Sequence, residues 1–166
     1  MHLELWLMRH ATAEDVGPGP DEARQLIPEG RLEARAQAAE LSRLRISFRC
    51  IVSSPLIRAI QTTDEVASIL RYEGEQRLDG RLEPEVTLKA MIALVREEFD
   101  RFSAPGGRLL LVGHNPSIGQ LKASLLGDHT ALNFKKAAIY GFDFTPGRRG
   151  SPDTARLVCS LPKPRV

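Results

Sequence analysis

Cysteine, aromatic residues and long apolar runs are scarce in this chain of 166 residues. Its two cysteines, Cys50 and Cys159, are too few for a disulfide framework, and no Cys/His cluster has metal-ligand spacing. No apolar run approaches the roughly 20 residues of a membrane helix. No N-terminal segment has the pattern of a secretion signal. We therefore expect a cytoplasmic protein with reduced thiols in buried strands, no bound metal and no membrane association.

An excess of one charge is also missing, because 23 basic residues face 21 acidic ones and leave a net charge of +2. That balance does not indicate a nucleic-acid-binding surface or a membrane-binding surface. Hydrophobic residues make up 42% of the chain, which is ordinary for a globular protein. The length suits one domain with a sizeable core, and we assign residues 1–166 to a single domain.

Short apolar runs alternate with stretches of helical period. Five runs predict strands buried on both faces: Leu3–Met8, Arg49–Ser53, Leu109–Val112, Ala137–Phe144 and Ala155–Leu161. The last two can pair as a hairpin. Four helices are expected: from Pro28, from Ser54-Pro55 with Ser54 as cap, over residues 88–102, and from Asn115-Pro116 to Gly127. The alternation indicates a three-layer α/β/α sandwich with a mainly parallel sheet. Residues 12–27 are expected to form a loop over the site, and residues 162–166 a frayed tail.

Four cationic or titratable residues follow the ends of these strands. Arg9 and His10 end the first apolar run, Arg58 follows the second, and His114 follows the third. Ligands of open parallel sheets bind beyond the carboxyl ends of the strands, so these side chains are expected to converge. Helix N-termini at the same edge add free N–H groups that favour an anion.

This set of residues suits phosphoryl transfer. Arginine is always charged and donates in a bidentate fork, so Arg9 and Arg58 are expected to bind the phosphoryl oxygens. A neutral imidazole can attack phosphorus, and His10 is the candidate nucleophile. A protonated His114 can hydrogen-bond the phosphoryl oxygens in the transition state. Water then hydrolyses the phosphohistidine. No metal or other cofactor is expected, since the arginines and the imidazolium supply the positive charge.

Three motifs resemble those of the histidine phosphatase, or phosphoglycerate mutase-like, superfamily. Leu7-Met8-Arg9-His10-Ala11 is similar to its Arg-His-Gly/Ala signature. Residues 53–62 resemble Ser-Pro-x-x-Arg-Ala-x-Gln-Thr, and Val112-Gly113-His114-Asn115-Pro116 resembles the third motif. They occur in family order. The resemblance implies a phosphoglycerate mutase-like fold and a metal-independent phosphatase, with phosphate bound by Arg9, His10, Arg58, His114 and Asn115.

Within that superfamily the chain looks most like the SixA-type phosphohistidine phosphatases. Residues 21–30 are similar to that group's Asp-x-x-Arg-Pro-Leu-Thr-x-x-Gly, with Gln25 and Ile27 in place of Pro and Thr. Only residues 71–86 separate the second helix from the third, where other members of the superfamily carry insertions that roof the pocket. A shallow, open site is therefore expected, and it can admit a phosphohistidine that projects from a protein.

The resemblance implies a signalling role in which the substrate is a phosphorylated protein such as a phosphotransfer domain. A small phosphomonoester is the alternative substrate, and a non-catalytic phosphate-binding module is the alternative class. The superfamily often has a glutamate acid between its second and third motifs, for which Glu83 is the candidate ahead of Glu85. A solvated loop carboxylate is the competing interpretation of Glu83. Lys135 and Lys136 are solvated loop charges or contacts to an acidic partner.

Overall fold

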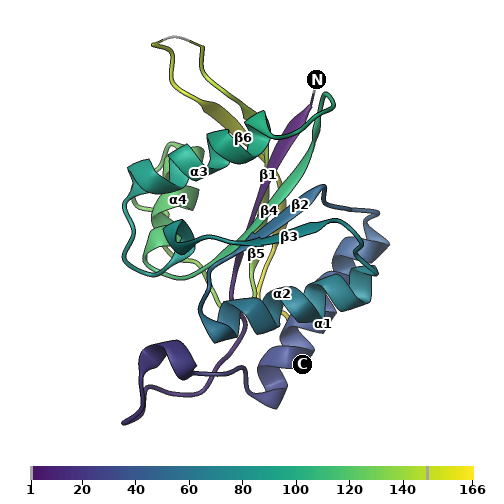
Figure 1. Ribbon diagram of the computed structural model, residues 1–166, viewed down its shortest axis with the longest axis vertical. Coiled ribbons are helices and arrows are strands. Elements are labelled where there is room, and N and C mark those ends of the chain that lie inside the picture. The colour runs from purple at the N-terminus through teal and green to yellow at the C-terminus, as the bar shows by residue number, and fades with distance from the viewer. Residues whose placement is uncertain (1, 149) are drawn as a thin grey trace.

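The computed structural model describes residues 2–148 and 150–166, which form one mixed sheet between two helical layers (Figure 1). The sheet has six strands in the order β3-β2-β4-β1-β5-β6. In chain order they are β1 Leu3–Arg9, β2 Cys50–Ser53, β3 Glu75–Leu78, β4 Gly107–Gly113, β5 Ile139–Thr145 and β6 Thr154–Leu161. The helices are α1 Pro28–Arg43, α2 Ile57–Leu70, α3 Leu88–Asp100 and α4 Ser117–Leu126, with short 3₁₀ turns η1 Asp21–Ala23 and η2 Gly80–Leu82.

Strand direction confirms the mainly parallel sheet. β4 is parallel to both of its neighbours, β1 and β2, and β3 is parallel to β2. β5 is antiparallel to β1 and to β6, so β5 alone runs against the other strands of the sheet. The predicted pairing of the last two strands is thereby confirmed. β5 and β6 can pair as antiparallel neighbours because they follow one another directly, without a crossover helix.

The three layers follow from the alternation of side chains along β1. Leu5 and Leu7 pack in the core under α3 and α4, whereas Trp6 and Met8 pack in the core under α1 and α2. Successive strand residues point to opposite faces, so a strand covered on both sides must be apolar at every position. Figure 1 shows the two helix pairs on opposite sides of the sheet. The α/β/α sandwich is therefore confirmed.

The helices lie close to their predicted positions, and the one difference concerns the N-cap of α2. Pro28 is the first residue of α1, and Gly127 ends α4 in the left-handed conformation, both as predicted. α2 begins at Ile57 and has Leu56, not Ser54, at its N-cap. The predicted capping role of Ser54 is therefore wrong, although its Oγ still accepts a hydrogen bond from the Leu56 amide at 3.2 Å. No described helix is long and apolar enough to cross a membrane.

The edges of the sheet differ most from expectation. β3 was not predicted, because its sequence Glu75-Gln76-Arg77-Leu78 has no apolar alternation and is largely exposed. A short charged strand is common at a sheet edge, where it discourages pairing with other chains. β6 forms the opposite edge and is mostly exposed rather than buried on both faces. Cys159 in β6 is consequently half-buried, while Cys50 is buried as expected.

Loop 12–27 is held against the start of α1 by polar contacts. The Thr12 amide and hydroxyl both donate to the Glu33 carboxylate at 2.9 Å. A Cβ on Gly30 would lie 1.9 Å from the Thr12 carbonyl oxygen, so this close approach requires glycine. Lys163 Nζ lies 2.9 Å from Glu33 Oε1, and Gln37 Nε2 donates to the Pro162 carbonyl. The first two residues of the expected frayed tail are therefore held against α1.

Candidate active site

The carboxyl ends of three neighbouring strands are level with one another. In the ladder between β1 and β4, Arg9 pairs with Gly113, and in the ladder between β2 and β4, Ser53 pairs with Val112. The residues that follow therefore leave the sheet at the same height. The His10 amide donates to the Gly113 carbonyl at 3.0 Å and so joins the ends of β1 and β4. This edge of the sheet is where the predicted site residues gather.

His10 lies directly after β1 and is 4% exposed. Its Nδ1 lies 2.7 Å from the Ala11 carbonyl oxygen, which can only accept, so Nδ1 carries the proton and Nε2 keeps its lone pair. Burial and the neighbouring His114 hold the pKa of His10 well below its ordinary value. The imidazole is therefore neutral near pH 7 and has the form that a nucleophile needs.

Arg58 lies in the first turn of α2 and is 3% exposed. Its Nη1 donates to the Asp21 carbonyl at 2.8 Å and its Nη2 to Asp21 Oδ2 at 2.9 Å. Asp21 comes from loop 12–27, so this loop contacts the site as predicted. The Arg24 and Arg58 guanidinium groups hold the pKa of Asp21 below its ordinary value, which keeps the ion pair charged. Asp21 fixes the plane of the guanidinium through two of its nitrogens.

Arg9 and Asn115 share one backbone acceptor. Arg9 Nη1 donates to the Phe134 carbonyl at 2.9 Å, and Asn115 Nδ2 donates to the same oxygen at 3.1 Å. Phe134 is buried, and its ring packs edge-on against Tyr140 at the start of β5. The segment before β5 therefore holds the residues that follow β1 and β4 in position. Burial and the nearby Arg58 lower the pKa of Arg9, yet an arginine stays charged at any physiological pH.

His114 follows β4 and faces His10, with the ring centroids 5.0 Å apart. Its Nε2 lies 2.8 Å from Ser54 Oγ. Burial and the Arg58 guanidinium lower the pKa of His114 to about 3. The sequence-based hypothesis assigns a protonated His114, but in the free enzyme this imidazole is neutral, because a third positive charge beside two arginines is unfavourable.

Four buried side-chain nitrogen or oxygen atoms have no hydrogen-bond partner among the described residues, and all belong to predicted phosphate-binding residues. They are Arg9 Nε, Arg58 Nε, His114 Nδ1 and Asn115 Oδ1. Unpaired buried donors cost free energy and mark functional sites when they gather in one place. Three of these atoms are nitrogens that can donate to an anion. These three donors suit the oxygens of a tetrahedral oxyanion, whereas Asn115 Oδ1 is an acceptor and cannot bind one.

Glu83 lies beside this site, in a pocket of about 350 Å³ lined by Asp21, Glu22, Leu56, Glu83, Pro84, Glu85 and Val86. Its carbonyl accepts from Ser117 Oγ at the start of α4. Asp21 lines this pocket and also accepts from Arg58, so the pocket adjoins the site. The acid role of Glu83 stays a prediction. Lys136 is half-buried and Lys135 is exposed just before β5, and their contacts with a partner also stay a prediction.

The site is less open than the short connection between α2 and α3 suggested. His10, Arg58 and His114 are each at most 4% exposed. Residues 71–87 contain only β3 and η2, so they add no further helix there. Loop 12–27 lies against Arg58 instead, which narrows access from another side. A slender group that carries a phosphoryl at its tip can enter such an opening more readily than a bulky one.

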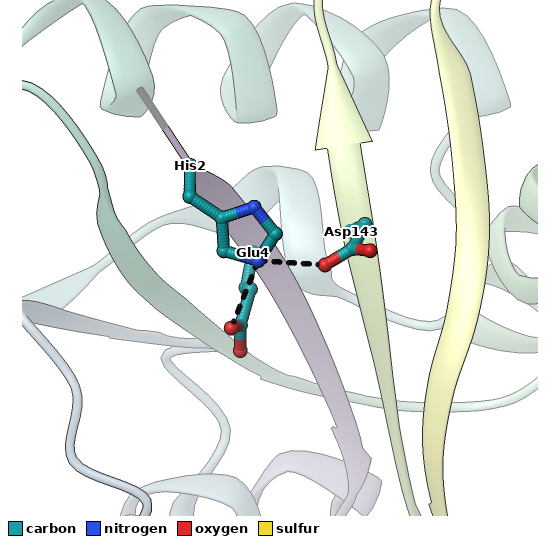
Figure 2. Close-up of side chains that lie close together, drawn as sticks. All are labelled: His2, Glu4 and Asp143. Carbon is teal, nitrogen blue, oxygen red and sulfur yellow. Dashed lines mark ion pairs between the residues drawn. The ribbon is translucent and has the colours of Figure 1, made fainter.

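Among residues 2–148 and 150–166, one group of three side chains could hold a metal ion, and it lies far along the sheet from His10. His2 Nε2 is 3.3 Å from Glu4 Oε1 and 2.8 Å from Asp143 Oδ1, at the beginning of β1 (Figure 2). Arg108 Nε donates to Glu4 at 2.6 Å, and Arg156 pairs with Asp143. Both carboxylates are already paired with arginines, so we interpret the group as an ion-pair network rather than a metal site.

Sequence reasoning did not identify the residues that hold the site together. Thr62 Oγ1 accepts from the Ala11 amide at 3.0 Å and donates to the Arg58 carbonyl at 2.7 Å. Gln61 Oε1 accepts from the Leu26 amide at 2.8 Å, which ties loop 12–27 to α2. Both residues belong to the second motif, so the motif marked them as important but did not indicate which groups they contact. Asp21 and Ser54 also lie within motifs of the sequence, residues 21–30 and 53–62, but their contacts with Arg58 and His114 were not predicted.

Comparison with known proteins supports the same assignment. The family model of the histidine phosphatase superfamily (branch 1) matches residues 5–83. An uncharacterized protein of Picosynechococcus sp. (strain ATCC 27264 / PCC 7002 / PR-6) is 34% identical over 165 residues, covering 97% of this chain and 98% of the relative. Phosphohistidine phosphatase SixA of Escherichia coli (strain K12) is 26% identical over 160 residues, covering 96% of each chain.

Solved structures agree on the fold. The protein histidine phosphatase SixA complexed with tungstate matches with a TM-score of 0.81 at 23% identity, over 97% of each chain. A putative phosphohistidine phosphatase SixA from Agrobacterium tumefaciens matches with a TM-score of 0.79 at 23% identity, over 97% of this chain and 98% of that one. These likenesses show a phosphoglycerate mutase-like α/β fold. Together with the family match and the relatives, they show that the chain belongs to the histidine phosphatase superfamily and is a phosphatase of the hydrolase class.

Proposed function

We propose that this phosphatase removes the phosphoryl group from a phosphohistidine on a protein, through a phosphohistidine intermediate at His10. The observation that carries the mechanism is the free Nε2 of a neutral His10 beside three unpaired donor nitrogens. The substrate class is supported by the Escherichia coli relative, which is named a phosphohistidine phosphatase and matches over 96% of each chain. A phosphotransfer domain of a signalling relay has the chemistry that this proposal requires.

In the first step, His10 Nε2 attacks phosphorus and forms a P–N bond while the P–N bond to the substrate imidazole breaks. Arg9, Arg58 and His114 donate to the equatorial oxygens, where charge concentrates in the transition state. The departing imidazole takes up one proton, for which Glu83 in the adjoining pocket is the candidate acid. In the second step, water attacks phosphorus, releases inorganic phosphate and returns His10 to its neutral form.

An imidazole leaving group reduces the need for a strong general acid. Protonated imidazole is a far better leaving group than an alkoxide, so cleavage of a P–N bond depends less on a strongly placed general acid. Glu83 is half-buried and lines the adjoining pocket, and no basic residue pairs with it among the described residues. A Glu83→Gln variant should therefore lose more activity on phosphomonoesters than on phosphohistidine.

The charge of the adjoining pocket argues against small acidic esters. Asp21, Glu22, Glu83 and Glu85 all line it, and three of these carboxylates lack a described basic partner. A substrate with a second anionic group, such as a phosphoglycerate, would meet like charges there. A small phosphomonoester with an uncharged body remains the second candidate, because the phosphoryl site itself would accept it.

Labelled phosphate tests the mechanism. The wild-type enzyme should acquire acid-labile, alkali-stable label from a phosphorylated histidine protein, and the His10→Ala variant should acquire none. His129→Ala is the matched control, because His129 is exposed and lies outside the site. Label and turnover that survive in His10→Ala would refute the intermediate.

A substrate panel tests the class. Turnover of a phosphohistidine protein is compared with that of neutral sugar phosphates and phosphoglycerates at equal concentration. The proposal expects kcat/KM to be highest for the protein and lowest for the phosphoglycerates. A higher kcat/KM for one small ester would overturn the protein-substrate assignment and leave the mechanism intact.

A further inference from the structure

We propose that Ser54 is a positioning residue that fixes His114 in the tautomer with its proton on Nδ1, so that a neutral His114 donates to the phosphoryl group. Ser54 lies between β2 and α2 and is fully buried. Its Oγ is 2.8 Å from His114 Nε2. The inference rests on the proposed role of His114 as a donor to the phosphoryl oxygens.

The position of Ser54 is fixed by backbone contacts on both sides. Its amide donates to the Val112 carbonyl at 2.9 Å, which ties it to β4 two residues before His114. Its Oγ accepts from the Leu56 amide at 3.2 Å, which ties it to the entry of α2. The hydroxyl therefore lies where the second and third motifs meet. Among the residues that the structure describes, His114 Nε2 is the other group within hydrogen-bond distance of it.

Counting protons decides the direction of this hydrogen bond. The hydroxyl has one proton and already accepts from the Leu56 amide. If Ser54 donates to His114 Nε2, every buried group is used and Nδ1–H remains as a donor. If Nε2–H donated instead, the serine proton would have no partner and a bare Nδ1 lone pair would face the anion site. An unpaired buried hydroxyl and a lone pair against an anion are both unfavourable, so the first arrangement is preferred.

The charges around His114 make its neutral form the relevant one. Arg58 of α2 and Arg9 of β1 oppose its protonation, and so does Arg24 of loop 12–27, while Asp21 of the same loop favours it and His10 lies alongside. Nδ1 is buried and has no partner among the described residues. A neutral ring can still donate through one nitrogen, provided that the tautomer is fixed, and Ser54 supplies that constraint.

Nitrogen NMR of the ¹⁵N-histidine-labelled free enzyme at pH 7 tests the tautomer without any substrate. His114 should show a protonated Nδ1 and an unprotonated Nε2, and Ser54→Ala should shift the population toward protonated Nε2. Ser53→Ala is the matched control, because Ser53 is also buried but donates to the Ser54 carbonyl. A protonated Nε2 with a bare Nδ1 in the wild-type enzyme would overturn the inference, whatever the substrate proves to be.

Kinetics with an aryl phosphate provide the second measurement. Ser54→Ala should lower kcat by roughly tenfold with a smaller change in KM, as expected for a lost orienting partner. Ser54→Thr keeps the hydroxyl and should recover most of that loss, and Ser53→Ala should stay near wild type. The pH profile of Ser54→Ala should shift relative to that of Ser53→Ala. Equal kcat and equal pH profiles in these two alanine variants would contradict the inference even if both are somewhat destabilised.

Discussion

Keeping two buried histidines neutral beside two arginines should make the stability of the free enzyme depend on pH. In the unfolded chain, His114 has an ordinary pKa of 6.5, and in the folded enzyme burial and Arg58 lower the pKa of His114 to about 3. Between these values the unfolded state binds more protons than the folded state. Stability is therefore complete above pH 6.5 and falls as the pH drops toward 3.

The size of the effect follows from the two pKa values. At pH 5 the unfolded imidazole is almost fully protonated, and the folded one is almost fully neutral. The pH lies 1.5 units below 6.5, so the loss from His114 alone is about 2 kcal/mol at 1.36 kcal/mol per unit. His10 is shifted in the same direction and adds to the loss. A few kcal/mol is a large part of the stability of a domain of this size.

Urea unfolding at pH 7.5, 6.5, 5.5 and 5.0 measures this dependence. His114→Gln removes the titrating ring while keeping a group that Ser54 can contact. Between pH 7.5 and 5.0 the free energy of unfolding of this variant should therefore fall by about 2 kcal/mol less than that of the wild type. His129→Gln should follow the wild type, because that ring is exposed. Identical slopes for wild type and His114→Gln would refute the assignment of a depressed pKa to His114.

Three further substitutions follow from the contacts described above. Arg58→Ala should lower kcat/KM by 10²–10³-fold, about 3–4 kcal/mol of transition-state stabilisation, as measured by steady-state kinetics. Gly30→Ala should lower the free energy of unfolding by about 1–3 kcal/mol in urea, because the new Cβ meets the Thr12 carbonyl at 1.9 Å. Glu33→Gln should cost about 2–3 kcal/mol in the same assay, since it removes a fully buried carboxylate from Lys163 and Thr12, and an unchanged midpoint would contradict the role assigned to that carboxylate.

The convergence of the site residues could be predicted from sequence because it depends only on strand direction. Arg9, His10 and His114 follow apolar runs that are parallel neighbours in the sheet, and Arg58 opens the helix after a third such strand. Apolar runs buried on both faces are the strongest local signal in an α/β protein. β3 lacked that signal because it lies at an edge, where one face and one row of backbone groups meet solvent.

The polar contacts within the site could not be predicted, because they depend on how distant segments approach each other. Ser54 had the sequence position of a helix cap, and a cap was the local interpretation. Its hydroxyl reaches His114 only because β2 and β4 are adjacent and in register. Asp21 meets Arg58 because loop 12–27 folds back along α2, held by Gln61. No pattern within either segment contains that information.

The distribution of charge in the free site suits an enzyme whose nucleophile must be ready before the substrate arrives. Arg9 and Arg58 carry permanent charge, and Asp21 offsets part of it at the outer side of Arg58. His10 is already neutral, so a positive charge on His114 would bring no further benefit to the nucleophile. It would also destabilise the folded enzyme, because three positive charges would then lie close together. With both rings neutral, His10 keeps its lone pair and His114 keeps one donor. The dianionic phosphoryl group then accepts from the single Nδ1–H donor of His114 and from both arginines, and these hydrogen bonds strengthen as negative charge concentrates on its equatorial oxygens in the transition state.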